Sequence, residues 1–160
     1  MSDLSHLDPS GRVRMVDVSA KEPTGRIAIA EGFLRASPDA LRHIAGGTLP
    51  KGDFRPVVQL AAIAAAKRTS ELIPLCHPLP LEHVEVLVET DVEAGHVRVV
   101  AQASASARTG VEMEALCAVS VGLLTAYDLL KAVDKNLRLD GIRLLEKRGG
   151  RSGPWKAAGA

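Results

Sequence analysis

The chain has 160 residues, which is the length of one domain and short for two independent hydrophobic cores. Apolar residues make up 46% of it and charged residues 24%, a composition that excludes a disordered or fibrous protein. The net charge is only +1, and one tryptophan, one tyrosine and two phenylalanines are the only aromatic side chains that could stack on bases. We therefore expect no nucleic-acid partner.

The N-terminal segment shows no signal for export. Met1 to Asp17 is polar and charged, without the apolar stretch of a secretory signal. The longest uncharged run, residues 115–127, falls well short of the roughly 20 residues that a membrane helix needs. These features predict a cytoplasmic protein without a membrane partner, in which Cys76 and Cys117 are expected to be free thiols.

The first half of the chain predicts one strand and two helices. Residues 25–36 alternate in polarity, as a half-buried strand does. Ser37 is a good N-cap for a short helix, which a glycine pair then ends. The alanine-rich stretch 53–69 predicts the second helix. Three prolines between residues 74 and 80 indicate an irregular loop.

The second half completes the fold class. A hairpin is predicted over 84–107, and a long helix and a strand around 142–144 follow. The order β, α, α, β, β, α, β is the split βαβ arrangement with an extra helix. We therefore expect an α+β, ferredoxin-like domain, an antiparallel sheet with helices on one face. It should span 15–153, between flexible tails at 1–14 and 154–160.

The long helix is predicted to run from about Val111 to Lys135. Thr109 and Glu112 have the spacing of a capping box at its start, and Glu114 is expected to project from a different face than Glu112. Small residues recur three and four positions apart further along the helix. That stripe favours close packing over ligand binding, and it comprises Ala115, Ala118, Gly122 and Ala126.

Three clusters of residues could carry chemistry. A proline-held loop presents His77, although a lone histidine is more often structural. Asp128 and Lys131 share a helix face, where an exposed pair is an ordinary ion pair and a buried pair an acid/base couple. The basic, glycine-rich run 147–153 could cradle a polyphosphate or be a frayed terminus. No Cys-x-x-Cys or His-x-x-x-His spacing occurs, so no metal is expected.

Six blocks of sequence, in order, resemble the MoaC family, the cyclic pyranopterin monophosphate synthases. They are Met15–Lys21, Ala65–Thr69, Leu72–Leu79, Thr109–Leu116, Tyr127–Val133 and Gly149–Gly153. The resemblance covers nearly the whole chain, and six blocks in register are far more specific than one short motif. Arg108 and Arg151 stand where lysine is commoner in the family; the positive charge is kept, but arginine binds phosphate through a planar fork.

The resemblance implies a phosphorus–oxygen lyase of molybdenum cofactor biosynthesis. Such an enzyme takes (8S)-3',8-cyclo-7,8-dihydroguanosine 5'-triphosphate, the product of a radical S-adenosylmethionine GTP cyclase, and yields cyclic pyranopterin monophosphate and diphosphate. The rearrangement needs proton transfers and no redox chemistry, so we expect no cofactor. The resemblance also implies a homohexamer built from dimers, with active sites at the subunit interfaces.

The same resemblance implies the roles of individual residues. The catalytic groups that it implies are Lys51, Asp128 and Lys131. The substrate-binding positions that it implies are Leu75, Cys76, His77, Glu112, Met113 and Glu114, supported by Arg26, Lys67 and Lys147. Glu114 and Lys131 are 17 positions apart on one predicted helix, which at about 1.5 Å per residue separates their backbones by roughly 25 Å. If both contact one substrate, they come from different subunits.

Two functions of other classes compete with this interpretation. A zinc-dependent nucleotide hydrolase would use Cys76, His77 and His83 as ligands, and pure protein would then carry stoichiometric metal. A ligand-sensing domain of the same fold would bind a nucleotide and show no turnover.

Overall fold

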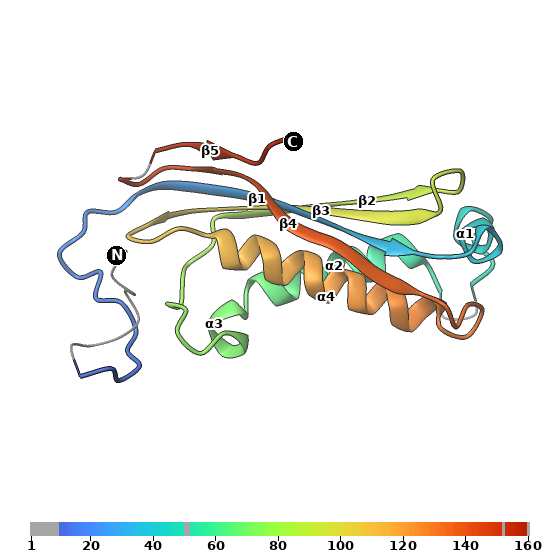
Figure 1. Ribbon diagram of the computed structural model, residues 1–160, viewed down its shortest axis with the longest axis horizontal. Helices are drawn as coiled ribbons and strands as arrows, with labels where there is room; N and C mark the ends of the chain where they lie inside the picture. Colours follow the sequence, from blue (N-terminus) through green and yellow to red (C-terminus); the bar gives the residue numbers. More distant parts are fainter. Residues whose placement is uncertain (1–9, 50–51, 152, 160) are drawn as a thin grey trace.

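The computed structural model describes residues 10–49, 52–151 and 153–159. Figure 1 shows a sheet with helices packed below it. In chain order the elements of these residues are β1 (Thr24–Arg35), α1 (Pro38–Ala45), α2 (Phe54–Ala66), α3 (Thr69–Leu72), β2 (His83–Asp91), β3 (His96–Ala107), α4 (Glu112–Leu130), β4 (Arg138–Arg148) and β5 (Trp155–Lys156).

The sheet is antiparallel throughout, with strand order β2-β3-β1-β4-β5. β1 lies at its centre and pairs with β3 without interruption, from Thr24 opposite Ala107 to Arg35 opposite His96. The pairing of β1 with β4 contains two register shifts, the kind of irregularity that a β-bulge produces. The α+β, ferredoxin-like fold expected from the sequence is therefore confirmed.

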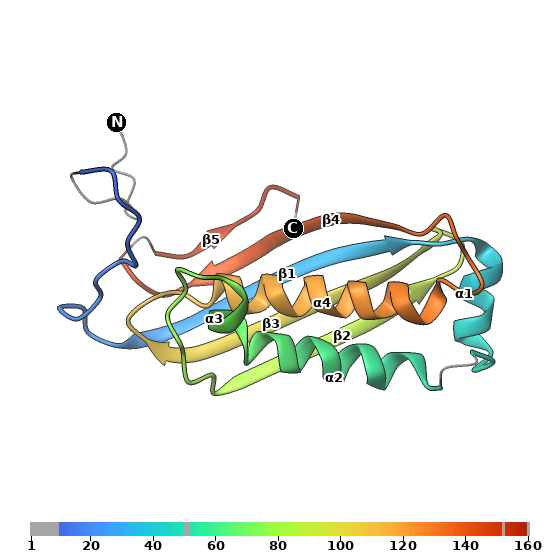
Figure 2. The same ribbon diagram turned by 90° about the horizontal axis from the view of Figure 1, so that it is seen from below.

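Helices α2 and α4 lie side by side along one face of the sheet, and α1 lies at one end of it (Figure 2). The layers approach closely because the buried positions of β1 and β3 are mostly alanine and valine. In α4 the stripe of small residues is buried as well, and a Cβ on Gly122 would lie only 3.3 Å from Ala62 of α2. The stripe therefore serves packing.

Helix α4 is the central core helix. By length and composition it could cross a membrane, with a mean hydropathy of 1.5, but 56% of that window is buried inside the protein. Its expected boundaries were partly wrong. It begins with Val111 as N-cap and no side-chain capping bond, and it ends at Leu130 rather than near Lys135.

Each error has a structural cause. The capping box predicted from Thr109 and Glu112 is absent because the Glu112 carboxylate instead pairs with Lys147 of β4, at 3.2 Å. At the other end, Val133 and Asp134 both donate their backbone N–H to the carbonyl of Leu130, which closes a turn in place of a further helical turn.

The opposite face of the sheet carries charged side chains. Glu31 of β1 is only 4% exposed and lies between Arg98 of β3 and Arg143 of β4, each 2.8 Å from its carboxylate. Burial opposes ionisation of Glu31, but hydrogen bonds from the two arginines hold its pKa below the usual value. A buried carboxylate thus links the three central strands.

Candidate active site

A pocket of about 490 Å³ surrounds the first turn of α4. Three segments far apart in the sequence form its walls: the stretch before β1, the loop after α3, and the start of α4 with the residues before it. The lining residues are Val16, Val18, Lys21, Leu75, Cys76, His77, Leu79, Thr109, Gly110, Glu112, Met113 and Glu114. All six residues that the resemblance marks as substrate-binding positions lie in this one pocket.

The loop after α3 is held in place by its own backbone. α3 ends at Leu72, and the backbone N–H of Cys76 donates to the carbonyl of Ile73 at 3.0 Å, which turns the chain towards α4. Prolines on either side of residues 75–77 restrict the backbone further. The thiol of Cys76 is partly buried, and this burial, with the nearby charge of Glu114, raises its pKa. Cys76 is therefore a thiol rather than a thiolate at neutral pH.

Two glutamates line the pocket although they are two positions apart on α4. Glu114 is only 4% exposed, whereas the side chain of Glu112 is 30% exposed. Residues from different faces of the helix can both line this pocket, because it surrounds the first turn of α4. Burial raises the pKa of Glu114; its own backbone N–H opposes that rise, and the charge of Glu112 adds to it.

We expect Glu114→Gln to raise the melting temperature at pH 7. Because the folded protein binds the Glu114 proton more tightly than the unfolded chain, whose glutamates titrate near about pH 4.3, stability falls as pH rises from there through the folded pKa. Glutamine cannot ionise and removes that fall. The two proteins should therefore have similar melting temperatures below about pH 4 and differ most near neutrality.

Calorimetry between pH 4 and 8 measures this effect, with Glu93→Gln, in the exposed turn after β2, as the matched control. A Glu114→Gln protein that melts lower than the unaltered one at pH 7 would show instead that the carboxylate is stabilised by a partner.

Two cations lie beside the pocket. Lys147 reaches Glu112 from β4, and Arg26 of β1 donates from Nε to the carbonyl of Ala107 at 3.2 Å. Gly149 and Gly150 have φ of 92° and 82°, in the left-handed region that favours glycine. A Cβ on Gly150 would overlap the Arg26 guanidinium, and one on Gly149 would overlap the Gly25 carbonyl. The absence of side chains at Gly149 and Gly150 thus leaves room for the Arg26 side chain beside them.

Lys67 lies at a second hollow, not in the main pocket. This hollow has a volume of about 460 Å³, and Lys67 and His83 are among its lining residues. Leu79 lines both hollows, so the two are neighbours. His83 is thereby separated from Cys76 and His77, with which it would form the zinc site of the alternative interpretation. Within the described ranges, no three histidine, cysteine, aspartate or glutamate side chains converge as metal ligands.

Asp128 and Lys131 lie at the other end of α4. Their charged groups are 2.6 Å apart, and both side chains are more than half exposed. The hydrogen bond and the negative charge of Asp128 raise the pKa of Lys131, so the lysine holds its proton at neutral pH. In the single chain the pair is therefore an exposed ion pair. Lys51, the remaining catalytic candidate, lies outside the described residues.

The sequence interpretation missed residues that the pocket contains. Val16, Val18 and Lys21 line it from the segment before β1. All three fall in the first of the six blocks that resemble the family, so the signal was present, but no role was carried over to them. Lys21 matters most, because it adds a positive charge to a pocket that otherwise contains two carboxylates.

The structure is an α+β domain with a pocket lined by two carboxylates, a histidine and a lysine. The chain belongs to the MoaC family, which it matches over residues 15–150. It is 53% identical over 155 residues to a protein of Roseiflexus sp. (strain RS-1), with 97% of this chain and 98% of that protein covered.

Two further relatives are as similar. A protein of Thermomicrobium roseum is 51% identical over 156 residues, covering 98% of this chain and 94% of the relative. One from Novosphingobium aromaticivorans is 52% identical over 158 residues, covering 99% of both chains. All three relatives are named cyclic pyranopterin monophosphate synthase.

Proposed function

We propose that this protein is a cyclic pyranopterin monophosphate synthase. It converts (8S)-3',8-cyclo-7,8-dihydroguanosine 5'-triphosphate into cyclic pyranopterin monophosphate and diphosphate in molybdenum cofactor biosynthesis. One observation carries the proposal most: the residues of three distant segments, 75–77, 112–114 and the stretch before β1, line one pocket of about 490 Å³. Near-full-length identity above 50% to synthases of that name supports the same reaction.

The charges around the pocket suit the two ends of this substrate. A guanine-derived ring presents N–H donors, which carboxylates such as Glu114 and Glu112 accept. A triphosphate needs cations; Lys147 contacts Glu112 at the pocket's edge, and Arg26 donates to the carbonyl of Ala107 nearby. Departure of diphosphate places charge on the leaving oxygens, which these cations stabilise as it develops. Lys67 adds a further positive charge for the diphosphate from the neighbouring hollow.

Lys131, Asp128 and Lys51 supply the proton transfers. Since the carboxylate of Asp128 raises the pKa of Lys131, Lys131 starts as an ammonium group and acts first as a general acid. Asp128 keeps it charged and orients it at 2.6 Å. Lys51 is assigned its role by the family resemblance alone.

The distance between the two ends of α4 supports a site shared between subunits. Met113 and Glu114 lie in the first turn of α4, whereas Lys131 is the C-cap at the other end of this 19-residue helix. We therefore propose a homo-oligomer, a hexamer built from dimers, with each active site formed between subunits. The protein works in the cytoplasm on a substrate that a radical S-adenosylmethionine GTP cyclase supplies.

The test is conversion of the cyclised dihydro-GTP by purified protein. Mass spectrometry should detect a cyclic pterin phosphate, and equimolar diphosphate should appear with it. GTP serves as the control substrate and should remain unchanged. Tight binding of the cyclised nucleotide without any product would favour the ligand-sensing alternative, and activity that a chelator abolishes and zinc alone restores would favour the hydrolase.

A further inference from the structure

Asp134 is a buried carboxylate for which the proposed reaction provides no role. It is 8% exposed and lies in the turn after α4, three residues beyond Lys131. Burying an ionised carboxylate is unfavourable unless hydrogen bonds compensate. Its partners therefore indicate what the residue does.

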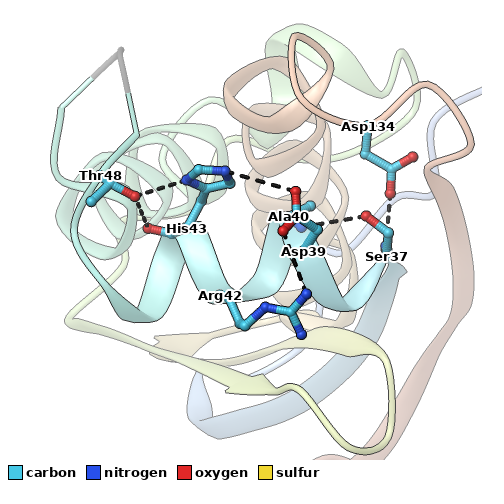
Figure 3. Close-up of polar contacts among 7 residues, drawn as sticks. All are labelled: Ser37, Asp39, Ala40, Arg42, His43, Thr48 and Asp134. Carbon is cyan, nitrogen blue, oxygen red and sulfur yellow. Dashed lines mark hydrogen bonds and ion pairs between the residues drawn. The ribbon is translucent and has the colours of Figure 1, made fainter.

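The Asp134 carboxylate joins two segments that are far apart in the sequence (Figure 3). One oxygen accepts the backbone N–H of Ser37 at 2.7 Å, and the other accepts the backbone N–H of Asn136 at 2.8 Å. Ser37 is the N-cap residue of α1, 97 positions earlier in the chain. These hydrogen bonds lower the pKa of Asp134, so it is ionised at neutral pH and both bonds are charge-assisted.

Helix α1 is a firm anchor for this link. Its side chains Ala40, Leu41 and Ile44 are buried in the core. The Ser37 hydroxyl caps its first turn by accepting the N–H of Ala40, and at the far end His43 contacts the Thr48 hydroxyl at 2.8 Å. Figure 3 shows both contacts on the same helix. Helix α1, whose N-cap residue Ser37 binds Asp134, is thus held at both ends and along its buried side.

The turn that carries Lys131 depends on its backbone for its position. The Lys131 side chain is 55% exposed, so packing contributes little to where its ammonium group lies. Its backbone N–H donates to Tyr127, and the next residues fold back onto the Leu130 carbonyl. Through Asp134 this turn is hydrogen-bonded to the start of α1.

We propose that Asp134 is a positioning residue for the reaction. Its carboxylate fixes the C-terminal turn of α4 against the start of α1, and this holds Lys131 and Asp128 in one geometry towards the substrate. The inference rests on the proposed function, because it gives Lys131 a chemical role. A misplacement of about 1 Å in a reacting group can cost roughly 100-fold in rate, so a fastening of this kind matters even far from the substrate.

The first test compares Asp134→Asn with Asp39→Asn. Asparagine has the size of aspartate but replaces one acceptor by a donor, which cannot bind a backbone N–H. We expect kcat of Asp134→Asn to fall about tenfold or more with KM changed less than about threefold, since binding is retained and geometry is lost. Asp39→Asn removes an exposed ion pair with Arg42 on α1 and should leave kcat unchanged.

Hydrogen exchange provides a second readout that needs no substrate. In Asp134→Asn, amides of both segments 37–45 and 127–136 should exchange faster together, while β3 residues 100–107 remain as in the unaltered protein. Unchanged exchange at the start of α1, or an unchanged kcat in a variant that only melts lower, would overturn the proposal. If the proposed function itself is wrong, the unaltered protein forms no product. The exchange pattern would then still show whether Asp134 holds the turn after α4 against α1.

Discussion

Replacing Lys131 with alanine is expected to lower turnover at saturating substrate by about 100-fold or more, because a general acid contributes roughly 10²–10⁴-fold to rate. The fold should be unaffected. Lys131 caps α4 through its backbone N–H, which alanine also has, and its side chain is mostly exposed beside Asp128. The melting temperature should therefore stay within about 2 °C of the unaltered protein.

Lys135→Ala is the matched control, because Lys135 is an exposed lysine only four positions further along the chain. It should retain normal turnover. Product formation measured by mass spectrometry in a single turnover separates chemistry from binding. Near-normal turnover of Lys131→Ala would remove this residue from the mechanism, whereas a comparable loss in Lys135→Ala would point to general charge rather than to a specific group.

Glu114→Ala and Lys131→Ala, each inactive alone, should regain activity when they are unfolded together and reassembled. If a site takes Glu114 from one subunit and Lys131 from a neighbour, random mixing leaves roughly a quarter of the sites with both groups intact. The physical reason is the length of α4, which keeps the two side chains at opposite ends of one rigid element. The fraction of activity recovered measures how many sites combine Glu114 of one subunit with Lys131 of another.

Native mass spectrometry of mass-labelled subunits verifies that mixed assemblies have formed. Each variant reassembled with itself is the control and should remain inactive. Mixed assemblies without recovered activity would show that both groups act within one chain, and a protein that remains monomeric at assay concentration would exclude a shared site altogether.

The strands and the fold class were predictable because their signals are local. Alternation of apolar and polar residues marks β1 and the β2–β3 hairpin directly, and Ser37 caps α1 as its residue type predicts. The capping-box prediction failed because its carboxylate pairs with a distant residue. Glu112 has the spacing of a capping residue, but Lys147, 35 positions away, is a stronger partner than a backbone N–H.

The candidate site was predictable in part for the same reason. Motif blocks identified residues 75–77 and 112–114 before their proximity was known, because their types are chemically distinctive. Neither Asp134 nor Glu31 could be selected in this way. Asp134 binds Ser37, 97 positions away, and Glu31 binds Arg98 and Arg143, 67 and 112 positions away; in the sequence each is one acidic residue among many. Likewise, no local pattern separates Lys67 from the main pocket.

The glycine pair beside Arg26 limits how this sequence can vary. Both positions have left-handed backbone, and at both a Cβ would overlap other atoms: the Gly25 carbonyl at Gly149 and the guanidinium at Gly150. In a library that varies these two codons, selection for activity should return glycine at both, whatever the neighbouring residues become. Position 149 should be the stricter, since a carbonyl of the central strand cannot move aside as a long side chain can.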